Sequence, residues 1–434
     1  MRRPIIALSA LTASFALATL LSATTSNSMY SQSYPAVVCP PTLGGLSSQI
    51  SISSTKTQFQ RLENRSTKTI PFNTLRYAVP KDSLVVSATG VTPVVWQSRS
   101  NSWAGGAICS GPITSAWFVG GSSDVTTRGK LIIVNSGLSE ASVDVQAYSE
   151  NGIQPATTLT LKAKSYSALP LDSLATGDKA LTVHVLARAG RINAFMVDEL
   201  GAGLRALGGD FVNPVTAPAT TVVIPAIPNQ LPKKGQKAFA THTLRILTPF
   251  ESDAKFTLEL LSADGNFIPV GFDSRSILAG KVTELKISPE LSASAFAVRI
   301  KATEPIVASI SSKVAINGRN DFLWSTPTPA LTKMSMAITG LSPLIAFAGD
   351  SIDVKVAVTL INGKKSFATI KASDIATWRI PNAARSITII SSSRDTYAGA
   401  LVASSNGYGY LPITAGSVLT RVEIPHSNIK VLNP

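Results

Sequence analysis

The sequence predicts an all-β protein, built from tandem immunoglobulin- or fibronectin-like β-sandwiches that follow an N-terminal signal segment. Three observations predict this class. Short apolar stretches show the two-residue alternation of half-buried strands, Asn-Gly and Asp-Gly pairs separate several of them, and the same landmarks recur along the chain. The composition agrees, because 44% of the residues are hydrophobic but only 15% are charged, and Ser, Thr, Val and Ile are abundant.

Residues 1–28 are predicted to be a signal peptide or a membrane anchor. Two arginines precede an apolar run from Ile5 to Ala23, the order that is typical of a secretory signal. Cleavage after Ala23 or after Ser28 and retention as an anchor both remain open. We therefore expect a secreted or cell-surface protein, whose only contact with a membrane would be this segment, if it is not cleaved.

A repeated unit organises the rest of the chain. Each unit begins with a short apolar strand followed by Pro or Gly, at Val37, Ala107, Val222 and Ala337. The last three starts lie about 115 residues apart, whereas the first lies only about 70 residues before the second. This spacing predicts a short incomplete β unit and three β-sandwiches, at residues 29–106, 107–219, 220–330 and 331–434.

Within each full unit the elements follow a common order. A strand pair turns at Asn151-Gly152, Asp264-Gly265 or Asn362-Gly363, which supply the positive φ angles of a two-residue hairpin. A Pro-bearing phrase follows (LPLDSL, LKISPEL or WRIPNAA), where we expect the chain to pass from one sheet to the other. Two more alternating strands close the unit, so that six or seven strands in about 110 residues indicate a sandwich.

The leading unit is incomplete. It contains the phrase RSTKTIPFNTL, starting at Arg65, and a closing strand pair, but no Asn-Gly hairpin. We do not expect it to fold alone.

Cys39 and Cys109 are the only cysteines, in a chain that we expect to reach an oxidising compartment. A disulfide between them would close a loop of about 70 residues and stabilise the fold by roughly 4 kcal/mol. They occupy equivalent positions in successive units, however, so the bond requires the leading segment to fold back on the second unit. A lipoprotein cysteine and a catalytic or metal-binding thiol are the weaker alternatives.

No catalytic, metal-binding or cofactor-binding motif is found. His184, His242 and His426 lie in different units without the spacing of zinc ligands, and no GxSxG motif is present. Asp198 and Glu199 are adjacent in a predicted strand and should therefore point to opposite faces, which does not suit a glycosidase pair. The sequence thus predicts no enzyme and no cofactor, with a wall-directed hydrolase as a remaining alternative.

Five lysines in loops are candidates for contact with polyanions. Lys233, Lys234 and Lys237 lie in a Pro- and Gly-containing segment, and Lys364 and Lys365 lie at a predicted hairpin tip. The formal net charge of +14 favours anionic partners such as cell-wall polymers or lipid headgroups, although ordinary solvation explains exposed lysines equally well. Nucleic acid is not expected, because basic and aromatic residues are not interleaved.

The segment from Cys109 to Gly152 resembles the hallmark stretch of a secreted actinobacterial family of unknown function. It has a cysteine, then WFVGG, an apolar strand that ends in Asn, and a second strand that ends in an Asn-Gly turn. The resemblance covers residues 109–200 most clearly. It implies an exported, cell-envelope-associated protein and assigns no catalytic residue.

These observations support three functional hypotheses. The first is a structural or adhesive cell-envelope protein whose basic loops meet anionic polymers. The second is a carbohydrate-binding module protein, in which some of the five tryptophans would stack on sugars. The third is a hydrolase, which would require His184, His242 or Asp198 to converge with other ionisable groups in a cleft.

Overall fold

The computed structural model describes residues 36–52, 57–62, 67–70, 76–79, 81–87, 90–203, 205–230, 242–316 and 318–416. The predicted signal segment lies outside these residues. The described chain is all-β, as predicted, and its one helical element is the short 3-10 helix η1, Leu171–Ser173. Among the described residues, no helix is long and apolar enough to span a membrane.

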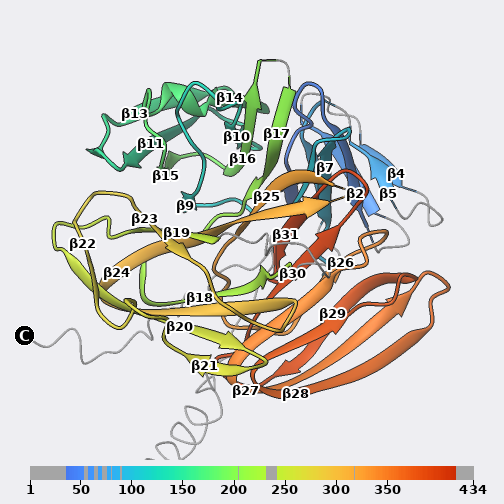
Figure 1. Ribbon diagram of the computed structural model, residues 1–434. Helices are drawn as coiled ribbons and strands as arrows, with labels where there is room; N and C mark the ends of the chain where they lie inside the picture. Colours follow the sequence, from blue (N-terminus) through green and yellow to red (C-terminus); the bar gives the residue numbers. More distant parts are fainter. Residues whose placement is uncertain are drawn as a thin grey trace, which may run out of the picture. The chain divides into compact units, whose positions relative to one another are not determined.

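The leading part of the chain forms two four-stranded antiparallel sheets (Figure 1). Their strand orders are β1-β6-β3-β4 and β5-β2-β7-β8. The strands are β1 (Ala36–Cys39), β2 (Ser47–Ser51), β3 (Thr57–Arg61), β4 (Thr67–Ile70), β5 (Arg76–Ala78), β6 (Leu84–Ser87), β7 (Val94–Arg99) and β8 (Trp103–Ile108). This part shares its core with the last part, because Val94, Trp96 and Ala104 belong to a core cluster formed mostly by residues 331–413.

The next part is a two-sheet sandwich, with strand orders β14-β10-β16-β17 and β12-β11-β15-β9, and with β13 also paired to β11. Its strands are β9 (Ser115–Val119), β10 (Lys130–Asn135), β11 (Ala141–Ser149), β12 (Gly152–Ile153), β13 (Thr157–Leu161), β14 (Ser165–Pro170), β15 (Leu181–Ala189), β16 (Ile192–Ala202) and β17 (Arg205–Val212). Side chains from both sheets, such as Phe118, Ile133 and Met196, share one buried core. The predicted hairpin at Asn151 and Gly152 joins β11 to β12.

Eight strands form the third part: β18 (Ala219–Pro228), β19 (His242–Leu247), β20 (Ala254–Ser262), β21 (Gly265–Phe267), β22 (Arg275–Ile277), β23 (Thr283–Ile287), β24 (Ala295–Ile316) and β25 (Arg319–Ser325). The two closing strands expected before β25 are in fact one strand of 22 residues, β24. Its first half pairs with β18 and β20, and its second half pairs with β19 and β25. The change of partners occurs at Thr303–Pro305, where proline has no N–H to donate.

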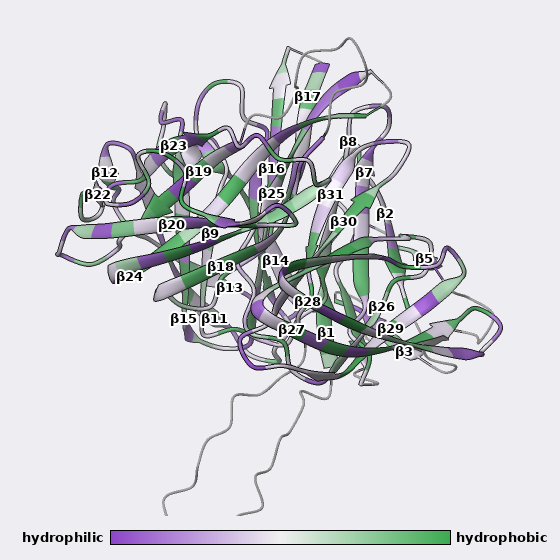
Figure 2. Ribbon diagram, turned by 60° about the horizontal axis from the view of Figure 1, so that its bottom comes forward, coloured by the Kyte–Doolittle hydropathy of each residue, from purple (hydrophilic) through white to green (hydrophobic). Residues whose placement is uncertain are grey.

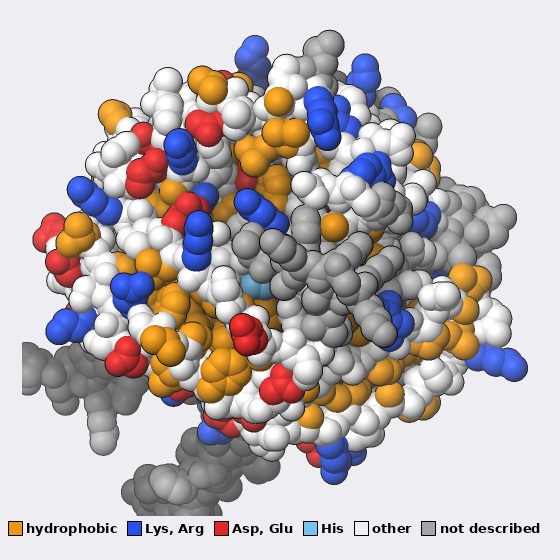
Figure 3. Space-filling view, viewed as in Figure 1, with side chains coloured by type: hydrophobic (Ala, Val, Ile, Leu, Met, Phe, Trp, Pro, Cys, Tyr) orange, Lys and Arg blue, Asp and Glu red, His pale blue; other side chains and the backbone are white. Residues whose placement is uncertain are grey.

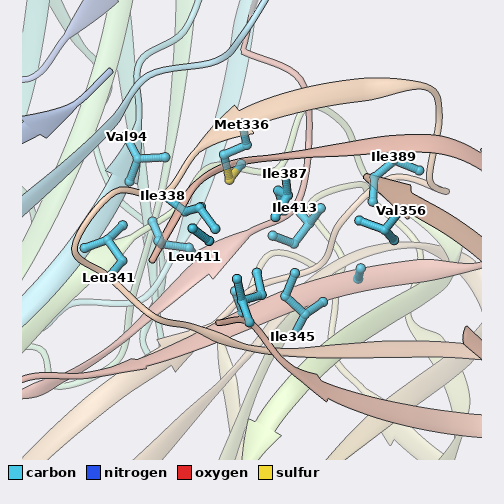
Figure 4. Close-up of a cluster of buried hydrophobic side chains, with 14 of the residues drawn as sticks. Val94, Met336, Ile338, Leu341, Ile345, Val356, Ile387, Ile389, Leu411 and Ile413 are labelled. Atoms are coloured by element: carbon cyan, nitrogen blue, oxygen red, sulfur yellow. The ribbon is translucent and has the colours of Figure 1, made fainter. Parts of the chain in front are cut away.

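The last part is a six-stranded sheet with the order β26-β29-β27-β30-β31, in which β28 also pairs with β27. Its strands are β26 (Met334–Ala337), β27 (Leu344–Leu360), β28 (Lys365–Arg379), β29 (Ala384–Ser392), β30 (Tyr397–Ala403) and β31 (Tyr408–Pro412). Figure 4 shows part of its core, where Ile345, Val356, Ile387 and Ile413 gather with Val94 from β7.

Apolar and polar residues alternate along many of these strands (Figure 2). β20 has the burial pattern of such a strand, because Phe256, Leu258 and Leu260 are buried and the residues between them are more exposed. Each buried face packs against a neighbouring sheet, which is the main source of stability in folds of this kind.

Four strands, each closing one of the four parts, meet in a group that we call the strand junction. It consists of β8, β17, β25 and β31, in which β17 lies against β8 and β25, and β31 lies against β25 and β8 (Figure 2). All described residues belong to one compact unit. The division of the sequence into four domains stays a prediction, since the junction and the shared core join the parts.

Candidate functional site

A polar cavity of about 960 Å³ lies at one end of the strand junction. It is lined by Ser102, just before β8, and by the first residues of β17 and β25, Arg205 and Arg319. A second, more apolar cavity of about 420 Å³ is lined by residues that follow the junction strands, including Ser110 and Thr328. The two cavities therefore lie at opposite ends of the junction strands.

Asp198 lies in the wall of the polar cavity and is only 3% exposed. Its Oδ2 accepts a hydrogen bond from the indole N–H of Trp324, 2.8 Å away in β25. The backbone N–H of Gly121 lies near this carboxylate, but no hydrogen bond of good geometry reaches Oδ1 within the described part of the chain. Burial raises the pKa of Asp198, and this outweighs the opposite effects of the Trp324 hydrogen bond and the charge of Arg245.

Arg245, from β19, also lines the cavity and is 4% exposed. Its Nη2 lies 2.7 Å from Oε1 of Glu284, and its Nη1 donates to the carbonyl oxygens of Gly121 and Leu181 at 2.5 and 2.8 Å. The guanidinium also lies over the ring of Trp324, 4.8 Å from the centroid. These contacts fix β19 and β25 against the preceding sandwich.

Two buried carboxylates hold the junction strands together. Oδ2 of Asp210, in β17, accepts the backbone N–H of Trp324 at 3.0 Å, and the backbone N–H of Tyr410, in β31, lies near this carboxylate. Asp210 therefore satisfies a backbone donor of β25 from another part of the chain. Burial raises its pKa well above the ordinary value, and the nearby charge of Asp321 raises it further.

Asp321, in β25, has the complementary role. Its Oδ1 accepts the backbone N–H groups of Gly209 and Phe322 at 3.1 and 2.9 Å, and its Oδ2 accepts that of Tyr408 at 3.2 Å. Burial raises the pKa of Asp321 to about 7, against the effect of these hydrogen bonds. Sequence reasoning missed both residues, although the dipeptide Asp-Phe, a charge within an apolar closing strand, occurs in both β17 and β25.

The adjacent carboxylates of Asp198 and Glu199 point to different partners, as their places in one strand predict. Both oxygens of Glu199 face Arg99, with Nε 2.7 Å from Oε1 and Nη2 2.9 Å from Oε2. This partly buried pair ties β16 to the end of β7, so the two acids do not form a cooperating pair.

The two described histidines are not brought together with each other or with Asp198. His184 is stacked on Trp117 with ring centroids 4.0 Å apart, and its Nε2 lies 2.9 Å from Oγ of Ser115. His242 is buried, and its Nδ1 lies 2.9 Å from Oγ of Ser312. No carboxylate bonds either ring among the described residues, so neither Ser-His pair is a catalytic triad. His426 lies outside the described residues.

The described residues contain no group of three or more His, Cys, Asp or Glu side chains that could hold a metal ion. The lining of the polar cavity offers hydrogen-bonding and charged groups, some of which also join different parts of the chain.

Comparison with known proteins identifies a family. Residues 79–377 match the model of a family of unknown function (DUF5719). The chain belongs to the DUF5719 family. This agrees with the resemblance to a family without an assigned activity, whereas an actinobacterial origin stays a prediction. No curated protein matches the chain.

One of the solved structures that match the chain is matched over much of its length. It is described as the tetra-tandem repeat in the extending region of a large adhesion protein, with 13% identity, and the match covers 86% of this chain and 92% of that chain. Its TM-score of 0.14 is too low for the comparison to bear on fold or function.

The DUF5719 region includes the whole group of Asp198, Arg245 and Trp324, but only one of the two cysteines. Cys39 and Cys109 form a disulfide, and both are buried. The leading segment does fold back, because Val38 in β1 exchanges backbone hydrogen bonds with Ser110 at 2.8 and 3.0 Å. The bond predicted from the sequence is therefore confirmed, and the objection from equivalent positions in the repeat does not apply.

The tryptophans of this DUF5719 protein do not form an exposed platform. Trp96, Trp103, Trp117 and Trp324 are buried, and Trp378 is half-buried against the core of the last part. An exposed aromatic strip for stacking on sugars is thus not formed by any of the five.

The lysines predicted to meet polyanions lie away from the polar cavity or outside the described residues. Lys364 and Lys365 are exposed at the turn between β27 and β28, as predicted, and do not line the cavity. Lys233, Lys234 and Lys237 lie outside the described residues. Figure 3 shows Lys and Arg side chains dispersed over one face, with acidic side chains between them.

Proposed function

We propose that the protein is an exported structural or adhesive protein of the cell envelope, which contacts anionic wall polymers through basic loops. The strand junction is the observation that carries this proposal. Asp210 and Asp321 accept backbone N–H groups from strands of different parts, and Arg245 and Glu199 form ion pairs beside them. Ionisable groups in the interior are thus used to fix the parts against one another, as a rigid spacer requires.

The exposed hairpin of β27 and β28 supplies a surface for the partner. The two strands are 17 and 15 residues long, and Lys364 and Lys365 lie at their connection. Neither ammonium group has an acidic partner among the described residues. Such exposed charges attract polyanions over a distance that salt shortens, so the binding should be salt-dependent.

Cell fractionation and a wall-binding assay test the proposal. The protein should be found outside the cytoplasm, and the purified protein should sediment with isolated cell walls at low salt and less at high salt. The double variant Lys364→Ala/Lys365→Ala should bind walls several-fold less tightly, whereas Lys255→Ala/Lys281→Ala, with the same loss of exposed charge elsewhere, should bind normally. A cytoplasmic location, or no wall binding at any salt concentration, would refute the proposal.

A further inference from the structure

The polar cavity contains buried polar atoms that lack partners. Oδ1 of Asp198 and Oγ of Ser102 make no hydrogen bond within the described part of the chain, and both residues line the cavity. Buried polar atoms are almost always hydrogen-bonded in folded proteins. Trp324 holds the carboxylate in place through its other oxygen, so that Asp198 is fixed in the cavity wall with its Oδ1 buried near the backbone N–H of Gly121.

The remaining lining is rich in hydroxyl and amide groups. Thr243 and Ser311 come from neighbouring strands of the third part, Asn101 comes from the turn before β8, and Asn320 is the second residue of β25. These side chains both donate and accept hydrogen bonds, and therefore complement a ligand with many hydroxyl groups. The volume is within the range that small-molecule sites occupy.

Unpaired cations add a charge preference. Lys179, Arg205 and Lys313 line the cavity, are exposed, and have no acidic partner among the described residues. Apart from Asp198, the acids of the lining are engaged elsewhere, because Glu284 pairs with Arg245 and Asp321 accepts backbone N–H groups. Asp124 accepts the backbone N–H of Thr126. A ligand that carries a negative charge as well as hydroxyl groups matches both the exposed cations and the hydroxyl and amide groups of the lining.

We propose that the cavity binds an acidic carbohydrate, with one sugar hydroxyl donating to Oδ1 of Asp198 and the acidic group near Lys313. This site is separate from the proposed surface contact through Lys364 and Lys365, because neither lysine lines the cavity. An experiment can therefore refute the site without refuting that contact. The same chemistry is present in a free acidic sugar and in a segment of an acidic polymer.

Calorimetric titration of the full chain tests the site, with trigalacturonic acid, neutral maltotriose and inorganic phosphate as probes. The acidic trisaccharide should bind more tightly than either of the others and should change the tryptophan fluorescence, since Trp324 lines the cavity. A longer polygalacturonate that binds no better per chain would indicate a free sugar as the ligand, and one that binds better would indicate a polymer. No binding of the trisaccharide, or equally tight binding of phosphate, would overturn the inference.

Two variants test separately how the hydrogen bond to Asp198 and the charge of Lys313 contribute to binding. In Asp198→Asn, the amide oxygen can still accept the hydrogen bond from the Trp324 indole. The amide N–H₂ then takes the place of Oδ1 and cannot accept the sugar hydroxyl, so the affinity for the trisaccharide should fall about tenfold. Lys313→Ala, at an exposed position that folding tolerates, should weaken the acidic trisaccharide several-fold and leave maltotriose unchanged. Lys255→Ala should change neither titration. If both cavity variants bind like the wild type, the inference is wrong, whereas wall binding that depends on Lys364 and Lys365 would still support the proposed function.

Discussion

The carboxylate of Asp321 accepts a hydrogen bond from the backbone N–H of Gly209, 3.1 Å away and 112 residues earlier in the chain. Since Tyr408 donates to the same carboxylate from β31, one side chain connects three of the four parts of the molecule. Buried N–H groups at places where strands meet without a regular ladder need such acceptors. The junction therefore depends on an acidic side chain whose charged form its buried surroundings disfavour.

Replacement of Asp321 by Asn should destabilise the protein. Asn has one acceptor oxygen, which can serve Gly209 and Phe322, but its N–H₂ would face the N–H of Tyr408. We expect the free energy of unfolding to fall by about 1–3 kcal/mol near pH 6. Urea denaturation measures this, with Asp172→Asn as the control at an exposed position. Equal stability of the two variants would show that the carboxylate is not needed.

The effect of this substitution should depend on pH. Burial raises the pKa of Asp321 from 3.8 to about 7, so the folded protein holds this proton more tightly than the unfolded chain does. The contribution to the free energy of unfolding is therefore fully present below about pH 4 and is lost as the pH rises to about 7, by at most about 4 kcal/mol. Because Asn does not titrate, the stability difference between wild type and Asp321→Asn should shrink over this range.

The wild type has to be compared with the Asp321→Asn variant because the titration of His242 changes the free energy of unfolding in the opposite direction. Burial lowers the pKa of His242 to about 4, so its contribution is present above about pH 6.5 and is lost as the pH falls toward 4. This contribution is common to both proteins and cancels in their difference. Denaturation curves of both proteins at several pH values between 4.5 and 8 measure the difference in their free energies of unfolding. A difference that stays constant with pH would contradict the assigned pKa shift of Asp321.

Much of the local structure could be predicted from the sequence. The hairpins at Asn151, Asp264 and Asn362 are present, because a two-residue turn depends on the residues in it. The Pro-bearing phrases predict a passage from one sheet to the other, and η1 does lead from β14 to β15 in the other sheet of its sandwich. The phrase between β28 and β29 does not, since both strands pair with β27 in one sheet.

The candidate site could not be predicted in the same way. Asp198 and Trp324 are 126 residues apart, and nothing near either residue specifies the other. The close approach of the closing strands depends on glycines and on buried acids that come from different parts of the chain. Only the repeated Asp-Phe dipeptide in otherwise apolar strands offered a signal, because a charge there requires compensation.

Loss of the disulfide should destabilise the fold without changing its architecture. The Cys39–Cys109 bond closes a loop with a sequence separation of 70, which in the chain-entropy model contributes about 4 kcal/mol. We expect a lower thermal midpoint for Cys39→Ala/Cys109→Ala and for the wild type under dithiothreitol. The chain has no other cysteine, so reductant should not affect the double variant. If reduction lowers the midpoint of that variant too, the effect does not come from this bond.

The close packing of β8 against the turn before β31 gives the most direct test of the strand junction. A Cβ atom on Gly407 would overlap the backbone nitrogen of Ala104 and would lie 2.6 Å from the carbonyl carbon of Trp103. Because the obstacle is the backbone of another strand, the two strands must separate, and Gly407→Ala should cost about 1–3 kcal/mol or more. Gly44→Ala is the matched control, since no atom lies within 4 Å of its added Cβ. Urea denaturation of both variants measures the difference, and equal stability would mean that β8 and β31 do not meet as described.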